Sequence, residues 1–330
     1  MNSDRILLRI DLSSKTFSTE EIPDQYLSQY IGGKGLGSKY LLDELKPRID
    51  PLGPDNKLIF VAGPVTATNF TTGNRYGILY KSPLTGTFAE SYSGGGAVQR
   101  MRGAGYFMVI ISGQMSSPTY LYISEKGVEF RDAKSLWGKD THSTYHKLTS
   151  NDKKFLDILC IGPAGENLVK IANIQNNLYH SAGRCGPGAV MGSKKLKAIV
   201  FEGKKRPLLN KKLEFKQVVR KMYKKMKQHP ELYGKEGVYR KYGTPIIVDW
   251  TNKLGCFPTR YFSAGYSKYY RNFNAETIIE TVLKKRVGCW NCSFTCGKYV
   301  EIVEDPYQCS LEGPEYETIA AFGGFCDVHD

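Results

Sequence analysis

Three cysteines, Cys289, Cys292 and Cys296, lie within eight residues of the sequence and form a C-x2-C-x3-C pattern. Three thiolates this close together on a turn-like backbone can each bind one iron of a cubic iron–sulfur cluster, and the fourth iron then takes a ligand from elsewhere in the fold. Trp290 and Phe294 stand among them, where their rings can keep water away from a cluster and so affect its reduction potential. The spacing favours a 4Fe–4S cluster.

Two other kinds of site also use closely spaced cysteines. A zinc knuckle combines one C-x-x-C with a second pair of Cys or His ligands at a regular spacing, and no such pair follows Cys296. A redox dithiol of the thioredoxin kind needs two cysteines beside a βαβ unit. The motif alone leaves both alternatives open behind the iron–sulfur interpretation.

Length and composition bound the class of protein. The chain has 330 residues, 41% hydrophobic and 24% charged, so it can bury a sizeable core and is expected to form two domains. Residues 1–10 lack the apolar core of a secretory signal, and no apolar run is long enough to cross a bilayer. The eight cysteines then read as reduced thiols or metal ligands, so we expect a cytoplasmic protein with no membrane partner.

Positive charge is concentrated in one segment. Residues 204–241 carry +11 of the net charge of +14, and a helix over 213–228 would place apolar side chains on one face and cations on the other. A solvated helix face is the ordinary interpretation. A docking surface for an acidic partner such as ferredoxin is the sharper one. Nucleic acid is not expected as a partner, because no recognised binding motif accompanies the charge.

The elements that must position these residues change in character along the chain. Strand-like segments cover residues 5–12, 58–62, 75–80, 106–112, 119–124, 155–161 and 196–201. Helices are predicted over 24–45, with a break around 32–37, and over 96–101. After residue 207 the chain becomes helical, charged and poor in strands, which predicts a domain boundary near residue 205.

Four glycine-rich segments precede that boundary. Residues 32–37 have the spacing G-x-G-x-G and no predicted strand directly before them, so they match a dinucleotide fingerprint poorly. Residues 73–76 place Arg75 where a loop enters a strand, and residues 91–96 and 182–194 should each open a helix that can hold an anion. Each segment alone is more often a turn that needs a positive φ. Together they suggest a large cofactor that carries phosphates.

In their order and spacing these segments resemble the tungsten-containing aldehyde ferredoxin oxidoreductases. The matching stretches are Ile31–Gly37, Ala62–Thr66, Gly73–Tyr76, Lys81–Gly86, Gly183–Lys194, Cys289–Cys296 and Glu312–Thr318, which span nearly the whole chain. The resemblance implies an α+β fold. Residues 1–205 would be a β-rich N-terminal domain of two sheets that form a saddle for the cofactor, and residues 206–330 would be an incomplete helical domain that carries the cysteines.

The resemblance also implies cofactors and an activity. The cofactors would be a 4Fe–4S cluster, a tungsten (or molybdenum) bis-pyranopterin, and Mg²⁺ that bridges the pterin phosphates. An aldehyde and water would give a carboxylic acid, and two electrons would pass through pterin and cluster to ferredoxin. The alternative is a non-catalytic subunit that binds cofactor or transfers electrons.

Site residues follow from the resemblance position by position. The pterin or phosphate–magnesium contacts fall on Arg75, Tyr92, Gly94, Gly183 and Arg184, and the cluster ligands fall on Cys289, Cys292 and Cys296. Tyr92 stands where the family often has an asparagine, and His180-Ser181 stand near the position of an Arg-Ala pair. These two departures affect two of the hydrogen bonds to the pterin that the resemblance implies.

The acidic turn from Glu312 to Glu317 supplies a candidate catalytic group. Pro314 suits the first turn of a helix, which would place Glu315 and Glu317 in that turn, where the helix dipole favours ionised carboxylates. Capping alone is one interpretation. The other makes Glu315 a catalytic residue that activates water or takes the aldehyde proton.

Members of the family continue far beyond the position of Asp330, where their remaining length holds the fourth cluster cysteine. We therefore expect a fragment, one half of a split enzyme whose other half is a separate chain, or a relative without turnover, and in each case a homo-oligomer. Within this chain the candidate fourth ligands are Cys256, Cys309 and Cys326. A buried thiol without function is the more common fate of a free cysteine.

Overall fold

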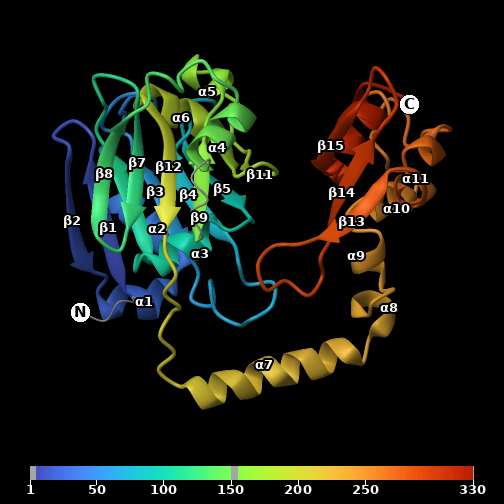
Figure 1. The fold of residues 1–330 in the computed structure, drawn as a ribbon, viewed down its shortest axis with the longest axis horizontal. Coiled ribbons are helices and arrows are strands. Elements are labelled where there is room, and N and C mark those ends of the chain that lie inside the picture. The colour runs from blue at the N-terminus through green and yellow to red at the C-terminus, as the bar shows by residue number, and fades with distance from the viewer. Residues whose placement is uncertain (1–4, 150–154, 330) are drawn as a thin grey trace. The chain divides into compact units, whose positions relative to one another are not determined.

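The structure is a computed structural model that describes residues 5–149 and 155–329. The chain divides into two compact units, Met1–Asn210 and Lys211–Asp330 (Figure 1). Among the residues described, no helix is long and apolar enough to cross a membrane.

Unit 1 is built from two six-stranded mixed sheets. The first has the order β2-β1-β6-β3-β4-β5, with bounds Thr16–Glu21, Ile6–Asp11, Met108–Ser112, Leu58–Ala62, Tyr76–Lys81 and Phe88–Ser93. The second has the order β11-β10-β9-β12-β7-β8, with bounds His180–Ala182, Ile174–Asn176, Leu156–Cys160, Leu196–Glu202, Thr119–Ser124 and Gly127–Asp132. Each sheet contains one parallel pair, β1–β6 and β12–β7, so neither is a doubly wound parallel sheet.

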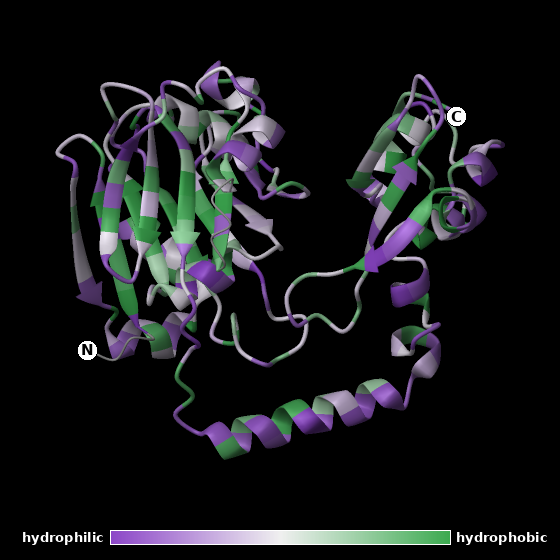
Figure 2. Cartoon of the chain, in the orientation of Figure 1, coloured by the Kyte–Doolittle hydropathy of each residue, from purple (hydrophilic) through white to green (hydrophobic). Residues whose placement is uncertain are grey.

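The core of unit 1 lies between the two sheets. Side chains alternate along each strand, so Leu8 and Ile10 of β1 face this core while Leu7 faces away. Two short helices, α3 (Ala97–Gly103) and α6 (Pro187–Ser193), add side chains to the same core. The opposite face of the first sheet is covered by α1 (Asp24–Tyr30) and α2 (Gly33–Glu44), and that of the second by α4 (Thr141–Thr149) (Figure 2). The remaining helix, α5, covers Pro163–Glu166.

Unit 2 combines short helices with a small antiparallel sheet. The helices are α7 (Lys212–Lys227), α8 (Pro230–Tyr233), α9 (Val238–Lys241), α10 (Ile246–Lys253), α11 (Ala275–Thr281) and α12 (Tyr316–Ile319). A 3₁₀ turn spans Tyr270–Asn272, and a π-helical segment spans Ala320–Phe325. The sheet has the order β13-β14-β15, with bounds Leu283–Val287, Gly297–Ile302 and Cys309–Glu312. No residue of α7 is buried.

The α+β class and all seven predicted strands are confirmed, each strand within two residues of its predicted ends. The strands that were not predicted include β2, whose six residues are all exposed, and β13, whose central residues are Lys284, Lys285 and Arg286. Polar and charged strands lack the apolar alternation that marks a strand. The second unit is therefore less purely helical than expected.

The predicted break in the first helix lies at one edge of the glycine run rather than within it. The chain leaves the helix at Ile31 and Gly32, both with positive φ, and the remaining glycines belong to α2. A Cβ on Gly37 would lie 2.6 Å from a methyl carbon of Leu79, so this glycine lets α2 pack closely on β4. The run serves helix packing, which agrees with the poor match to a dinucleotide fingerprint.

Candidate metal and cofactor sites

The predicted cofactor contacts of unit 1 lie at one end of the two sheets, where β5 and β11 are neighbours. Arg75 directly precedes β4, and Tyr92 of β5 pairs with Gly77 of β4. Gly183 and Arg184 directly follow β11, and the backbone N–H of Arg184 donates a 3.0 Å hydrogen bond to the hydroxyl of Ser91 in β5. The fold therefore gathers residues that lie over a hundred positions apart in the sequence.

Both arginines of this group are available to a ligand. Arg75 and Arg184 are exposed, and neither guanidinium forms an ion pair with any residue that the structure describes. The backbone of each is nevertheless fixed: the Arg75 carbonyl accepts a 3.1 Å hydrogen bond from Thr66, and the Arg184 carbonyl accepts one from Tyr80. A free guanidinium on a fixed backbone suits bidentate binding of phosphate.

Two buried amides hold the turn that contains Gly94. The Asn176 side chain donates a 2.7 Å hydrogen bond to the Gly94 carbonyl, and the Asn74 side chain donates one of 3.1 Å to the Gly95 carbonyl. A Cβ on Gly95, whose φ is +77°, would lie 2.7 Å from the Asn176 amide nitrogen. Sequence reasoning missed Asn176, because nothing local connects it to a turn eighty residues earlier.

The start of α3 is occupied by the chain's own carboxylate. A Cβ on Gly96, which precedes the helix, would lie 2.5 Å from Oδ1 of Asp157. Asp157 also accepts hydrogen bonds from Arg100 (2.8 Å) and Asn177, and burial raises its pKa. The side chain of Asp157, from β9, therefore lies against the residue that directly precedes α3.

Most glycines of the segment 182–194 have a packing role. A Cβ on Gly186 would lie 2.0 Å from the Lys170 carbonyl oxygen, and one on Gly192 would lie 1.9 Å from that of Gly165. Only a residue without a side chain allows such backbone approaches. Gly183 is different, because it is exposed and its nearest neighbour would be the Ser181 hydroxyl at 3.8 Å.

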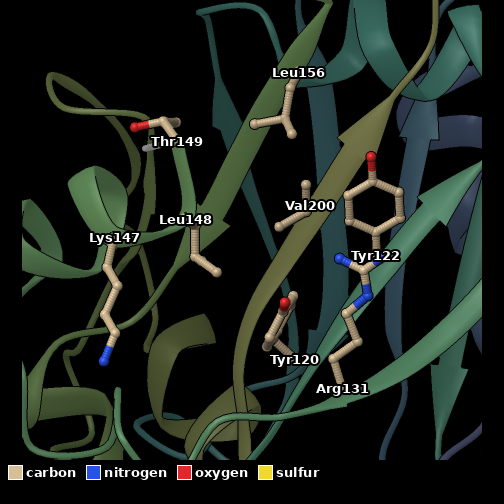
Figure 3. Close-up of a pocket in the computed structure, with 8 residues that line it drawn as sticks. All are labelled: Tyr120, Tyr122, Arg131, Lys147, Leu148, Thr149, Leu156 and Val200. Atoms are coloured by element: carbon tan, nitrogen blue, oxygen red, sulfur yellow. The ribbon is translucent and has the colours of Figure 1, made fainter. Parts of the chain in front are cut away.

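Figure 3 shows a different concavity, on the outer face of the second sheet. This pocket of about 110 Å³ is lined partly by Tyr120, Tyr122 and Arg131, with the Arg131 guanidinium 4.0 Å from the ring centre of Tyr122. Arg131 also pairs with Glu129 at 2.7 Å. None of the predicted site residues lines this pocket, so it is separate from the group at β5 and β11.

In unit 2 the three cysteines lie on the loop that joins β13 to β14. Val287 and Gly297 pair across its two ends, and all three thiols are half-buried. Within the loop Thr295 has a φ of +42°, which is strained for a β-branched residue. Phe294 stacks on Tyr233, with ring centres 5.2 Å apart, so aromatic packing fixes the loop from one side.

The thiols are close enough to affect one another. Burial raises the pKa of Cys296, and the charges of Glu315, Cys292 and Cys289 raise it further. Three soft thiol donors on one loop fit the ligand type of an iron–sulfur cluster. Within the described ranges, no group of three or more His, Cys, Asp or Glu side chains converges on a single metal ion.

The candidate fourth ligands do not join this loop. Cys309 pairs with Ile302 at the far end of β14, five residues from Gly297, which at a rise of about 3.3 Å per residue places it about 17 Å away. Cys256 and Cys326 are exposed, and neither belongs to a metal-binding group among the residues described. The structure gives none of these three cysteines support as a fourth ligand.

Glu315 lies close to the cysteine loop, but it does not cap a helix. It directly precedes α12 and its side chain makes no capping hydrogen bond, so the prediction that Pro314 and Glu315 lie in the first turn is wrong. Glu317 does lie in that turn. The Glu315 carboxylate instead accepts a hydrogen bond from Thr244, and its charge acts on Cys296 and on Lys298.

Lys298 is a second residue that sequence reasoning missed. It is 1% exposed, and its Nζ donates a 2.8 Å hydrogen bond to the Cys296 carbonyl. Burial lowers the pKa of Lys298 to about 8, against the opposing charges of Cys296 and Glu315. The carboxylate of Glu315, the amine of Lys298 and the thiol of Cys296 therefore lie close together.

Comparison with known proteins covers both units. Residues 7–203 match the family model described as aldehyde ferredoxin oxidoreductase, N-terminal domain, and residues 217–330 match that of domains 2 and 3. The chain is 39% identical to a tungsten-containing aldehyde ferredoxin oxidoreductase of Pyrococcus horikoshii and 40% identical to one of Thermococcus kodakarensis. In both cases the match covers 98% of this chain and 53% of the relative.

More distant relatives carry other names. The WOR-like subunit of an aliphatic sulfonate oxidoreductase from Pyrococcus furiosus is 30% identical, over 96% of this chain and 52% of that protein. Among solved structures, the active-site complex BamBC of benzoyl coenzyme A reductase matches with a TM-score of 0.85 and 26% identity, over 99% of this chain and 50% of that one. The chain spans about half the length of the curated relatives it matches, and it belongs to the aldehyde ferredoxin oxidoreductase family.

Proposed function

We propose that this chain is the N-terminal portion of an oxidoreductase, dependent on a tungsten pterin and a 4Fe–4S cluster, that oxidises aldehydes to carboxylic acids with ferredoxin as electron acceptor. One observation carries the proposal: a chain of this family has both groups of residues that the cofactors would need. The first is the exposed group of Arg75, Arg184 and Gly183 near β5 and β11, and the second is the loop with three half-buried thiols.

In unit 1 the proposed cofactor contacts follow from exposure and charge. Arg75 and Arg184 would bind the pterin phosphates through free guanidinium groups on a fixed backbone, and Mg²⁺ would be held by the same phosphates. Gly94 and Gly183 would let the backbone approach the ligand, and Tyr92, which is 40% exposed, would lie beside it. When bound, a tungsten pterin supplies the oxo transfer and accepts the two electrons of aldehyde oxidation.

In unit 2 the chain's own residues would hold the cluster and handle the proton. Cys289, Cys292 and Cys296 would each bind one iron through a thiolate. Glu315, whose carboxylate is held by Thr244, would accept the proton that aldehyde oxidation releases. Tungsten is proposed over molybdenum because the most similar proteins reported above are tungsten enzymes.

The same proposal includes partners and location. The lysine-rich helix α7, with no buried residue, is the proposed docking surface for acidic ferredoxin. We further propose a cytoplasmic protein that works with the remaining half of its relatives' length, supplied in the same or a separate chain, as a homo-oligomer.

A second candidate is a subunit that binds the cluster and transfers electrons without oxidising aldehydes. It is favoured by the half-length match to proteins that include a subunit of an aliphatic sulfonate oxidoreductase.

The deciding experiment is anoxic purification followed by analysis of tungsten, molybdenum and iron. The proposal predicts about four irons per chain together with tungsten, and aldehyde-dependent reduction of ferredoxin or a viologen dye. Four irons without tungsten or aldehyde oxidation would favour the electron-transfer subunit. Protein that holds neither metal would overturn both candidates.

A further inference from the structure

Lys298 is a buried cation whose direct contacts do not balance its charge. It lies in β14, two residues after Cys296, and it is among the largest fully buried side chains of the molecule. Its Nζ donates hydrogen bonds only to carbonyl oxygens, those of Cys296 at 2.8 Å and Arg240 at 3.3 Å. In the part of the chain that the structure describes, no carboxylate lies within ion-pair distance of Nζ. Burial of a charge in this way is costly unless an opposite charge is close.

The surrounding backbone fixes the ammonium group against the cysteine loop. Arg240 lies in the last turn of α9, so its carbonyl is available to a cation at that helix end. Gly243 follows with a φ of +65°, and a Cβ there would lie 2.4 Å from the Cys296 carbonyl oxygen and 3.2 Å from Nζ. Helix end, glycine turn and cysteine loop therefore meet around one positive charge.

We propose that Lys298 is the fixed counter-charge of the cluster bound by Cys289, Cys292 and Cys296, and that it sets the reduction potential of that cluster. The inference rests on the proposed 4Fe–4S site and adds a positioning residue to it. Thiolate ligation gives the cluster a net negative charge, and each electron it accepts makes that charge larger. A buried cation beside the loop stabilises the reduced form more than the oxidised form, which raises the potential.

Charges of both signs face Lys298, so the inference predicts effects of both signs. The carboxylates of Glu315 and Glu312 act on it as negative charges, and Arg286 of the neighbouring strand β13 acts as a positive one. Glu315 also acts on the Cys296 thiol. Removal of the Lys298 charge should therefore lower the cluster potential, and removal of the Glu315 charge should raise it.

The test is a redox titration of the cluster, followed by electron paramagnetic resonance, in the anoxically purified protein. Lys298→Met should lower the midpoint potential while iron content stays at the wild-type value, and Lys298→Arg should return the potential toward wild type. Lys284→Met is the matched control, because Lys284 lies on β13 but is exposed and paired with Glu301 at 2.7 Å. The control should leave the potential unchanged.

An unchanged potential in Lys298→Met with a full complement of iron would overturn the inference and leave the cluster assignment intact. If Lys298→Met does not retain iron, Glu315→Gln is the deciding variant, because it removes a negative charge instead of a positive one. A raised cluster potential in Glu315→Gln supports the inference, and an unchanged or lowered one overturns it. Wild-type protein without iron would instead overturn the cluster on which the inference rests.

Discussion

The hydroxyl of Thr244 donates a hydrogen bond to the carboxylate of Glu315, and it accepts a 3.0 Å hydrogen bond from the backbone N–H of Tyr316. Thr244 lies just before α10 and Glu315 just before α12. One hydroxyl therefore joins the starts of two helices and fixes the direction of the Glu315 side chain. The Glu315 carboxylate is therefore held by Thr244 instead of capping α12.

Glu315→Gln is expected to keep iron and tungsten and to reduce kcat roughly a hundredfold or more, because an amide cannot accept the proton. Thr244→Val is the companion variant. It removes the hydroxyl that binds both Glu315 and the Tyr316 N–H, so it should cost about 1–3 kcal/mol of stability. Steady-state aldehyde oxidation and thermal unfolding separate the two effects. Full turnover by Glu315→Gln in the loaded enzyme would remove Glu315 from the mechanism.

Replacement of Cys289, Cys292 or Cys296 by Ser, one at a time, is expected to abolish the visible absorption of the cluster and to lower iron content. Each thiolate would bind one iron, so a weaker ligand at any position should destabilise the cluster. Cys309→Ser is the control, because Cys309 lies at the far end of β14 and β15 and should retain full iron. Iron content that is the same in all four variants would show that the loop binds no cluster.

Gly192 and Gly183, both in the segment 182–194, should respond differently to replacement by alanine. Gly192→Ala would place Cβ 1.9 Å from the Gly165 carbonyl oxygen, so unit 1 should lose about 3 kcal/mol or more of stability, or fail to fold. Gly183→Ala meets nothing closer than 3.8 Å and should leave the unfolding temperature unchanged while tungsten content falls. Calorimetry and metal analysis of both variants check this. Normal tungsten content in Gly183→Ala would argue against a cofactor contact at this glycine.

The pH dependence of stability should report on buried Lys194. Burial lowers its pKa from 10.5 to about 7, and its Nζ donates hydrogen bonds to the carbonyl oxygens of Gly113 (2.9 Å) and Pro54 (3.2 Å). Between those two pH values the unfolded chain binds more protons than the folded chain. Stability should therefore rise with pH from about 7 to about 10, with a contribution of up to about 1.4 kcal/mol per pH unit.

Urea unfolding at a series of pH values measures this slope. Lys194→Met should remove the contribution of Lys194 to the slope of stability against pH. The control variant Lys134→Met, at an exposed lysine, should leave that slope as it is in the wild type. A slope that is identical in wild type and Lys194→Met would show that Lys194 stays charged in the folded chain.

Features that depend on residues close together in the chain could be predicted without the structure. Strand-like composition marked seven strands, the spacing of Cys289, Cys292 and Cys296 indicated thiol ligation, and the order of short motifs indicated the family. The strands, the cysteine spacing and each single motif are contained within a few residues, so they can be recognised in the sequence without the fold. Strands with polar or charged faces, such as β2 and β13, gave no such signal, because their place in a sheet depends on the partner strand.

Which distant residues meet became visible in the folded chain alone. Asp157 lies against Gly96 and the backbone of Gly165 approaches Gly192, so these two glycines are packing positions, while Asn176 holds the Gly94 carbonyl. Lys298 reads in the sequence as one lysine among many, yet β14 and the end of α9 bury it behind Cys296. A local sequence pattern contains information about residues that are close together in the chain. Burial and charge pairing arise from contacts between segments far apart in the chain, and no local pattern contains information about those contacts.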